Sequence, residues 1–413
     1  MNMSYKTAAI FTLGCRTNQA ESDQIARDLL ESGIRLVPFK EKADLYLINT
    51  CTVTKNADKK ARNILRSVLK RNHRRSNHSS QESIVVVTGC FVDSTPNLKD
   101  EIPGDYLMLV NQDKHNVIKK LNPLAPRQKP AAPHVAAPPK VRANLMIQNG
   151  CENFCSYCIV PYVRGKPQSV PPKEIICQAR KLVEGGTREI ILTGINLGAY
   201  GPKLIKVIQA LSKIRGLTRL RLSSIEPQYV THSLIREIKN NPKVCQHLHL
   251  PMQSGDDRIL KSMRRQYTAR QFIDLCKNAK KQIPELSITT DIIVGFPGED
   301  DSAFNNTLTA SREIGFSRIH VFSFSPRPNT RAATLPGQID AKIIEKRRQM
   351  LNKLRTELME KFAARYHGKL VAVLAEEYHP KEKELEGLTS NYLRVKFKGN
   401  KKLVGKVAKV KAS

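Results

Sequence analysis

The most distinctive stretch of this chain is NGCENFCSYCIVPYVR, residues 149–164. It contains Cys151, Cys155 and Cys158 in a CxxxCxxC spacing, with the aromatic residue Tyr157 directly before the last cysteine. Three thiolates on one short loop can hold three irons of a cubane iron–sulfur cluster, and the fourth iron then stays open for another ligand. We therefore interpret this stretch as a metal-cluster loop.

Two other uses of three cysteines fit the stretch less well. A structural zinc site usually has four ligands, often as two CxxC or HxxxH pairs, and no second pair follows here. A disulfide framework needs an even number of cysteines and an exported chain, and residues 1–15 have too short an apolar core for a secretion signal. The nine cysteines of the chain are therefore expected in a reducing cytoplasm and point to metal binding.

The triplet, with an aromatic residue before its third cysteine, resembles the radical S-adenosylmethionine (SAM) superfamily. This resemblance implies that Cys151, Cys155 and Cys158 are the catalytic ligands of a 4Fe–4S cluster. It also implies that the amino and carboxylate groups of SAM chelate the open iron. The reduced cluster is then expected to cleave SAM to methionine and a 5′-deoxyadenosyl radical.

Strand-like runs alternate with helix-length segments after the Pro-rich region. These runs are 145–149, 189–193, 218–223, 247–251, 290–295 and 318–324. Six βα units are too few for a closed eight-stranded barrel, and they suit the partial (β/α)6 barrel that radical SAM enzymes share. A long helix with an apolar stripe is predicted after the barrel, over residues 340–366. The stripe comprises Ile343, Met350, Leu354, Leu358 and Phe362.

Small and polar residues follow the predicted barrel strands. Each one alone is more often a turn or capping residue than a ligand. Active sites of such barrels lie at the carboxyl ends of the strands, so together these residues suit the adenine, ribose and aminocarboxylate of SAM. They are Thr193, Gly194, Asn196, Ser224, Glu226, Gln253, Gly295 and Glu299. His247 and His249, which alternate with leucines, are interpreted as satisfied core or lumen histidines and not as metal ligands.

A second set of three cysteines ends the apolar runs of the N-terminal region. The runs 7–14, 43–50 and 83–89 are followed directly by Cys15, Cys51 and Cys90, with helical segments between the runs. This alternation predicts a doubly wound parallel α/β domain, whose ligands gather at the carboxyl ends of the strands. The three cysteines are therefore expected to meet and hold a second cluster. The alternative is three buried structural cysteines, because free cysteine is a common core residue.

The charge of the chain indicates a polyanionic partner. The formal net charge is +32, and Lys and Arg release counterions from phosphates on binding. Residues 59–75 carry eight Lys or Arg and no acid, and so do the short strand-like runs of residues 390–413. We interpret both as RNA contacts. The alternatives are a solvated basic face for residues 59–75 and a dimerising or solubilising tail for residues 390–413. No apolar run approaches the ~20 residues of a membrane span.

The order of parts resembles the methylthiotransferase family, which joins an N-terminal domain with three scattered cysteines, a radical SAM barrel and a small TRAM domain. The resemblance covers essentially the whole chain. Matching segments are LGCRTNQAESD, INTCTVTKNADKKAR, QNGCENFCSYCIVPYVRG, ILTGINLGAYG, HLPMQSGDD and TTDIIVGFPGE.

This resemblance implies four parts. Residues 1–122 form the N-terminal domain, 123–140 with their six prolines a linker, 141–365 the barrel with its following helix, and 366–413 a small TRAM-like β-barrel that binds RNA.

The family resemblance also implies the roles of particular residues. Cys15, Cys51 and Cys90 bind an auxiliary 4Fe–4S cluster, and Tyr157 and Arg265 join the residues that bind SAM. Two SAM molecules are used: one methylates a sulfur held at the auxiliary cluster, and the other generates the radical. An external electron donor and a sulfur source are further partners.

Within the family, the segments TVT after Cys51, GCR at Cys15 and VFSFSPRPNTRAAT resemble the branch called MtaB. That branch adds a methylthio group to C2 of N6-threonylcarbamoyladenosine at position 37, in the anticodon arm of tRNA. Sister branches act on isopentenyladenosine 37 or on an aspartate of a ribosomal protein, and both stay open as alternatives. A non-catalytic iron–sulfur RNA-binding protein is a more remote one, because it leaves the strand-end residues of the barrel unexplained.

Two positions depart from the family pattern. Gln168 stands where the family has arginine, which weakens any anion-binding role there, and Asp256 stands where serine is frequent. Neither position is an expected cluster ligand.

Overall fold

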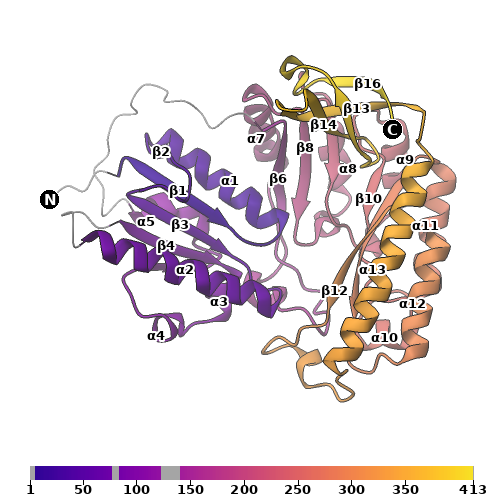
Figure 1. Ribbon diagram of the computed structural model, residues 1–413, viewed down its shortest axis with the longest axis horizontal. Helices are drawn as coiled ribbons and strands as arrows, with labels where there is room; N and C mark the ends of the chain where they lie inside the picture. The colour runs from indigo at the N-terminus through magenta and orange to yellow at the C-terminus, as the bar shows by residue number, and fades with distance from the viewer. Residues whose placement is uncertain (1–4, 77–82, 122–139, 413) are drawn as a thin grey trace. The chain divides into compact units, whose positions relative to one another are not determined.

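The structure is a computed structural model that describes residues 5–76, 83–121 and 140–412. The chain forms two compact units (Figure 1). The N-terminal unit is drawn from Met1–Pro139, Gly150–Glu152 and Cys158–Lys166, and the barrel unit from Lys140–Asn149, Asn153–Tyr157 and Pro167–Ser413. The predicted linker lies, apart from Lys140, outside the described residues, and the predicted domain boundaries stay predictions.

The N-terminal unit is built on a parallel five-stranded sheet in the order β2-β1-β3-β4-β5. The strands are β1 Thr7–Thr12, β2 Arg35–Leu36, β3 Leu45–Thr50, β4 Ile84–Gly89 and β5 Leu107–Leu109. The helices are α1 Arg16–Glu31, α2 Lys55–Ser76, α3 Cys90–Ser94, α4 Leu98–Glu101, α5 Val117–Leu121 and α6 Val160–Arg164.

Alternate side chains of the central strands face two separate cores, as the period of a strand requires. Leu45 and Leu47 of β3 belong to the core that includes Leu29 of α1. Tyr46, between them, belongs to the core that includes Leu65 of α2. Helices therefore cover both faces of the parallel sheet, and the predicted doubly wound fold is confirmed.

Six parallel strands form the centre of the barrel unit. They are β6 Arg142–Asn149, β8 Glu189–Gly194, β9 Arg219–Leu222, β10 His247–His249, β11 Ser287–Val294 and β12 Arg318–Ser323. β6, β8 and β9 share one sheet with the short antiparallel β7 Gln168–Ser169, and β10, β11 and β12 form another. Parallel bridges from Leu220 to Val244 and from Ser224 to His249 link the two sheets. Each strand overlaps a predicted run, and the partial (β/α)6 barrel is confirmed.

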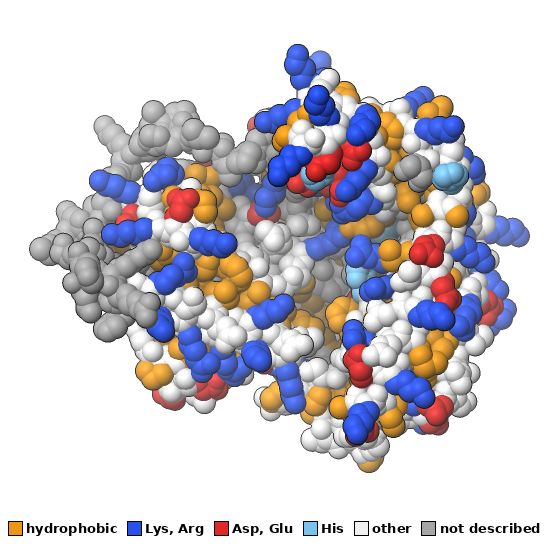
Figure 2. All heavy atoms as spheres, viewed as in Figure 1, with side chains coloured by type: hydrophobic (Ala, Val, Ile, Leu, Met, Phe, Trp, Pro, Cys, Tyr) orange, Lys and Arg blue, Asp and Glu red, His pale blue; other side chains and the backbone are white. Residues whose placement is uncertain are grey.

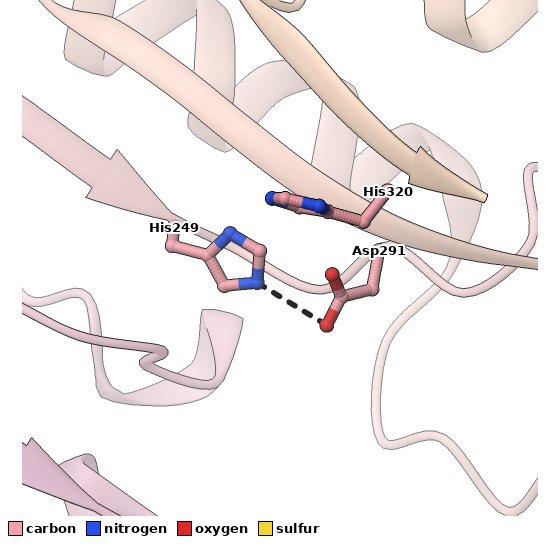
Figure 3. A group of neighbouring side chains, drawn as sticks. All are labelled: His249, Asp291 and His320. Carbon is pink, nitrogen blue, oxygen red and sulfur yellow. Dashed lines mark ion pairs between the residues drawn. The ribbon is translucent and has the colours of Figure 1, made fainter. Parts of the chain in front are cut away.

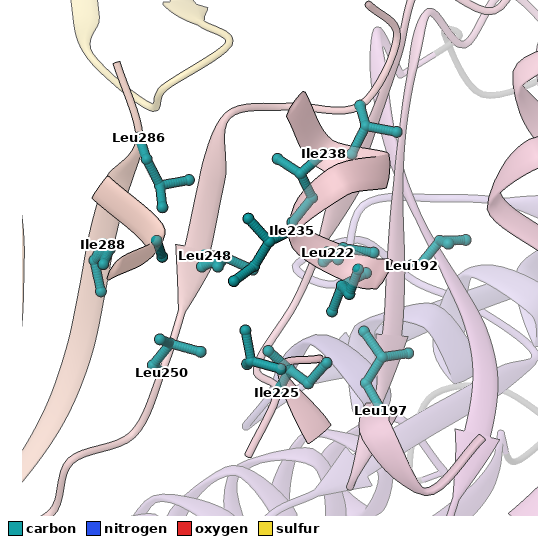
Figure 4. Packing of buried hydrophobic residues seen from close by; sticks show 14 of the residues in the cluster. Leu192, Leu197, Leu222, Ile225, Ile235, Ile238, Leu248, Leu250, Leu286 and Ile288 are labelled. Atoms are coloured by element: carbon teal, nitrogen blue, oxygen red, sulfur yellow. The ribbon is translucent and has the colours of Figure 1, made fainter. Parts of the chain in front are cut away.

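Helices cover the outside of these strands. They are α7 Pro172–Glu184, α8 Lys203–Ser212, α9 His232–Asn240, α10 Asp257–Ser262, α11 Ala269–Gln282, α12 Asp301–Ile314 and α13 Ala341–Ala364. Leu192, Leu222, Leu248 and Ile288, one from each of four strands, lie in a single buried cluster with Ile235 of α9 (Figure 4). The neighbouring strand residues consequently point away from the helices, into the lumen.

The apolar stripe predicted for α13 is wrong at two positions. Ile343 and Met350 are 44% and 43% exposed, and the buried face instead includes Arg347 and Leu351. Arg347 is buried because its Nη1 contacts a carboxylate oxygen of Glu299 at 3.1 Å. A pattern of apolar letters does not reveal a buried arginine.

The C-terminal residues form a four-stranded antiparallel sheet in the order β15-β14-β13-β16. Its strands are β13 Leu370–His379, β14 Glu384–Thr389, β15 Arg394–Lys398 and β16 Val407–Lys411. This sheet is consistent with the small β-barrel expected there. Among the described residues, no helix has the length and apolar character needed to cross a membrane.

Candidate active site

The three N-terminal cysteines lie at the carboxyl ends of neighbouring strands. Cys15 is the N-cap of α1, three residues beyond the end of β1. Cys51 directly follows β3, and Cys90 directly follows β4. β3 lies between β1 and β4 in the sheet. The structure therefore brings Cys15, Cys51 and Cys90 to one edge, as the sequence predicts.

Two glycines make this close approach possible. Gly14 has φ +108°, and a Cβ built on it would lie 2.7 Å from Cβ of Cys51. Gly89 has φ +102°, and its Cβ would lie 2.3 Å from the carbonyl oxygen of Thr50. Both the backbone conformation and the lack of space require glycine at these strand ends.

Arg164 of α6 brings a buried positive charge to these cysteines. Its Nε donates to Sγ of Cys90 at 3.2 Å. Its other nitrogens donate to Oε1 of Glu21 at 2.8 Å and to Oδ1 of Asn18 at 2.5 Å. Asn111 Nδ2 also approaches Sγ of Cys90, at 3.7 Å. N–H donors around a thiolate stabilise its negative charge, so this set fits an anionic thiolate cluster.

A second buried cation, Lys114, pairs with the same glutamate as Arg164. Nζ of Lys114, fully buried, lies 2.7 Å from Oε2 of Glu21. Burial alone would raise the pKa of Glu21, but the charges of Lys114 and Arg164 outweigh it and lower this pKa to about 2. Burial raises the pKa of the Cys51 thiol to about 11, and the neighbouring Cys90 and Cys15 add to this. A bound metal is what would hold Cys51 as a thiolate near neutral pH.

The CxxxCxxC loop is held by backbone hydrogen bonds within each unit. In the N-terminal unit, the Cys151 amide donates to the carbonyl of Gly165 at 3.0 Å. In the barrel unit, the Ser156 amide donates to the carbonyl of Met263 at 3.1 Å, and the Ala332 amide donates to the carbonyl of Ser156 at 2.7 Å. Tyr157 packs on the apolar cluster around Phe296.

Arg265 donates a hydrogen bond to a cysteine of the CxxxCxxC loop, as Arg164 does to a cysteine of the N-terminal triplet. Its Nη1 donates to Sγ of Cys155 at 3.3 Å. Its guanidinium also pairs with the carboxylate of Glu226, and its Nε donates to the hydroxyl of Tyr267 at 3.0 Å. An arginine donor at a ligand sulfur again fits a cluster of net negative charge.

The remaining predicted SAM-binding residues lie at the carboxyl ends of the barrel strands. Thr193 and Gly194 end β8, and the Asn196 amide donates to Oε1 of Gln148 at 2.8 Å. Gln253 takes a left-handed backbone conformation, with φ +64°. Ser224 pairs with His249 in an isolated bridge.

Glu299 supports the loop that follows β11. Its Oε2 accepts from the amide of Gly295 at 2.7 Å and from Arg347. Its Oε1 is buried without a hydrogen-bond partner among the described residues. The two residues that depart from the family pattern lie apart from these contacts: Gln168 is exposed in β7, and Asp256 is the N-cap of α10.

The comparisons with known proteins agree with this arrangement. Residues 145–310 match the family described as "Radical SAM superfamily", and residues 7–109 match "Uncharacterized protein family UPF0004". The chain is 36% identical to the threonylcarbamoyladenosine tRNA methylthiotransferase MtaB of Bacillus subtilis, over 98% of this chain and 93% of the relative. It is 33% identical to the tRNA-2-methylthio-N(6)-dimethylallyladenosine synthase of Lachnoclostridium phytofermentans, over 98% and 93% of the two chains.

The chain belongs to the radical SAM tRNA methylthiotransferases. A solved radical SAM methyltransferase, TsrM from Kitasatospora setae, is similar to this methylthiotransferase with a TM-score of 0.59, over 80% of this chain and 77% of that one. Its sequence is 12% identical, so this likeness concerns the fold alone. The roles assigned to individual site residues stay predictions.

Several residues of this methylthiotransferase's site could not be found from sequence reasoning. Asn111 contacts Cys90 only in the folded unit. Glu21 and Lys114 pair with each other, and Glu21 pairs with Arg164, although these three residues are far apart in sequence. Arg164 stands inside the quoted loop stretch, but a single arginine after a cysteine loop gives no signal of its partner.

Proposed function

We propose that this methylthiotransferase adds a methylthio group to C2 of N6-threonylcarbamoyladenosine at position 37 of tRNA, with two SAM molecules and two 4Fe–4S clusters. The observation that carries the proposal is the pair of cysteine triplets, each with an arginine that donates to one sulfur. The substrate assignment is supported by the MtaB enzymes of Bacillus subtilis and Thermotoga maritima, with 36% and 33% identity.

In this proposal, Cys151, Cys155 and Cys158 hold the SAM cluster. With SAM bound, that cluster supplies a 5′-deoxyadenosyl radical able to take hydrogen from an adenine carbon. Arg265 fixes Cys155 through its hydrogen bond, and Glu226 keeps Arg265 in place. The other SAM contacts come from the residues that surround the ends of the barrel strands. They are Tyr157, Thr193, Gly194, Asn196, Ser224, Gln253, Gly295 and Glu299.

Cys15, Cys51 and Cys90 hold the auxiliary cluster in the same proposal. When bound, that cluster would supply the attachment point for the sulfur that is transferred. Arg164 and Asn111 stabilise the thiolate of Cys90, and Glu21 with Lys114 keeps the Arg164 charge paired in the interior. An external electron donor and a sulfur source complete the reaction.

The anticodon arm of tRNA is the proposed partner of the basic surface. Lys59, Lys60, Arg66 and Lys70 are exposed on α2. Figure 2 shows further Lys and Arg side chains over the C-terminal strands, at the top of that view. Phosphate contacts of this kind position an RNA, and a base in a loop can be turned out to reach an enclosed site. A tRNA substrate also implies a cytoplasmic enzyme.

Mass spectrometry of tRNA nucleosides tests this function. The protein is reconstituted without oxygen and incubated with SAM, sulfide, a reductant and tRNA that carries N6-threonylcarbamoyladenosine. We expect the 2-methylthio derivative to appear with the wild type and with C177A, which removes an exposed cysteine outside both triplets. We expect it to be absent with C15A and with C155A.

The products distinguish the ways in which the proposal could fail. If 5′-deoxyadenosine forms and this nucleoside stays unmodified, the radical chemistry holds and the substrate is wrong. The same assay with tRNA that carries the isopentenyl group tests the second candidate, which relatives named for dimethylallyladenosine support at 33–36% identity. If no 5′-deoxyadenosine forms, the proposed reaction is wrong.

A further inference from the structure

Three side chains of the barrel unit converge on one point of the lumen. They are His249 of β10, Asp291 of β11 and His320 of β12, and one ligand atom from each lies within 4.8 Å of the other two (Figure 3). His249 Nε2 lies 3.2 Å from Oδ2 of Asp291. The two imidazole rings have their centroids 5.7 Å apart.

Strand register explains why these residues share a face. Asp291 of β11 is paired with His320 of β12, and His249 of β10 is paired with Thr289, two residues before Asp291. Positions two apart on a strand point to the same side. Ile292, next to Asp291, lies in the helix-covered core. The three side chains consequently face the lumen, from three adjacent strands.

Thr289 contacts the ring nitrogen of His249 that does not contact Asp291. Its hydroxyl lies 2.9 Å from Nδ1 of His249 and 3.0 Å from Nε2 of His247. When Nδ1 carries the proton and donates to Thr289, the lone pair of Nε2 faces the carboxylate of Asp291. Two acceptors at that separation repel each other unless a proton or a metal cation lies between them. A hydrogen bond behind the ring that presents the other nitrogen is the usual support of a metal-bound histidine.

The alternation of His249 with leucines predicts a core or lumen histidine and not a metal ligand, and the convergence of His249 with Asp291 and His320 changes that interpretation. We propose that His249, Asp291 and His320 bind one divalent transition-metal ion such as Zn²⁺ or Fe²⁺. Two imidazoles and one carboxylate on one face are a ligand set that these ions favour, and such a set leaves coordination positions open. The open positions face the lumen. This site uses none of the residues of the two cysteine triplets.

Two further barrel strands, β6 and β9, offer polar groups to whatever occupies the lumen. Oδ1 of Asn144 on β6 and Oγ of Ser223, just after β9, are buried without a hydrogen-bond partner among the described residues. Both alternate with core-facing residues of their strands, so they point inward. A metal-bound water or a carboxylate ligand would give such groups partners in an otherwise enclosed space.

Metal content of the reconstituted enzyme tests the proposal. With both clusters in place, the protein is dialysed against micromolar Zn²⁺, and bound zinc is measured by mass spectrometry. We expect one bound zinc per chain in the wild type. D291N and H320N should each lose the bound zinc, because only two ligands remain. Loss of a residue that merely supports a ligand weakens metal binding by ~10–100-fold, and loss of a ligand itself should weaken it further. H232N, which changes an exposed histidine at the start of α9, should keep it.

A spectroscopic measurement on the wild type keeps the test independent of how the variants fold. Co²⁺ bound to the enzyme with oxidised clusters should give a high-spin signal with nitrogen couplings from two imidazoles. The visible absorbance of the clusters shows whether each variant is intact. The proposal is overturned if the wild type binds no zinc, if all four proteins bind it equally, or if the Co²⁺ signal shows no imidazole nitrogen.

Discussion

At the scale of the residue, each cysteine triplet has one arginine that donates a hydrogen bond to one of its sulfurs. Arg164 donates to Cys90 and Arg265 donates to Cys155, and each guanidinium is also paired with one buried or partly buried glutamate. Pairing is necessary because an isolated guanidinium in the interior would be strongly destabilising. The glutamates therefore keep a positive charge beside each proposed cluster.

The hydrogen bond from Arg164 should raise the reduction potential of the auxiliary cluster. A charge-assisted hydrogen bond contributes about 1.5–3 kcal/mol, and it favours the reduced, more negative state. R164K keeps the charge but loses the Nε–H donor, so we expect the potential to fall by tens of millivolts, since ~59 mV is a factor of ten for one electron. Redox titration followed by electron paramagnetic resonance, in a C155A background that silences the other cluster, measures it.

An exposed arginine of the same unit provides the control for this variant. R66K changes a side chain on the outer face of α2 and should leave the potential where it is. Equal potentials in R164K and the parent protein would mean that the Arg164–Cys90 contact has no electronic role.

Glu21 should make the N-terminal unit sensitive to acid. Its pKa is lowered to about 2 in the folded state, so it contributes stability above its ordinary pKa of 4.5, and this contribution is lost as the pH falls from 4.5 to about 2. E21Q removes the contribution and leaves two buried cations, which costs about 3–5 kcal/mol near pH 7. Urea unfolding of the cluster-free chain should show a larger difference between wild type and E21Q at pH 7 than at pH 3, where part of the contribution of Glu21 has been lost.

At the scale of the secondary-structure element, the ends of neighbouring parallel strands bring Cys15, Cys51 and Cys90 together. Parallel strands all finish at one edge, so residues that directly follow neighbouring strands are brought together without any contact between distant loops. Gly14 and Gly89 let the chain turn sharply enough for Cys15 and Cys90 to begin the next segment. His249, Asp291 and His320 meet by a different principle, because the register of three paired strands brings them to the same face of the sheet.

G89A should damage the N-terminal unit and its proposed cluster alone. The new Cβ would lie 2.3 Å from the carbonyl of Thr50, and relieving this clash at positive φ costs about 2–4 kcal/mol. We expect loss of the iron held by Cys15, Cys51 and Cys90, measured as iron per chain, with the radical SAM cluster retained. G201A, also at positive φ but with nothing near its Cβ, should keep all its iron.

At the scale of the whole molecule, the C-terminal sheet is part of the barrel unit. Arg219 donates to the carbonyls of Leu388 and Ala372, at 2.5 and 2.8 Å. Arg221 donates to the carbonyl of Ser390 at 3.0 Å and pairs with Glu189 at 2.7 Å, fully buried. The arginines at the base of the barrel thus satisfy backbone groups of the sheet, which fixes a basic surface to the catalytic unit.

R221M should loosen the C-terminal sheet as well as the barrel. It leaves Glu189 short of one charge partner and frees the carbonyls of Thr389 and Ser390, at a cost of about 3–5 kcal/mol. Hydrogen exchange followed by mass spectrometry should show faster exchange in β14 and β15, together with a lower melting temperature. R215M, at an exposed position, serves as the comparison; identical exchange in both variants would show that this network does not hold the sheet.

The sequence by itself determined the architecture and both cysteine triplets. Apolar runs with a fixed alternation, and cysteines placed directly after them, are local signals, because a strand's periodicity and its terminus are properties of consecutive residues. The doubly wound sheet, the six barrel strands and the meeting of Cys15, Cys51 and Cys90 followed from those signals and the topology of parallel sheets.

Only the tertiary structure decided which charged side chains accompany these sites. Glu21 pairs with Arg164 from 143 residues away in sequence and with Lys114 from 93 residues away. His249, Asp291 and His320 meet through the register of three strands. Arg347 lies on the buried face of α13, which the apolar pattern did not predict, because its partner Glu299 comes from another part of the chain. Whether a charge is buried depends on the partner that neutralises it, and that partner is fixed by the three-dimensional packing and not by the neighbouring letters.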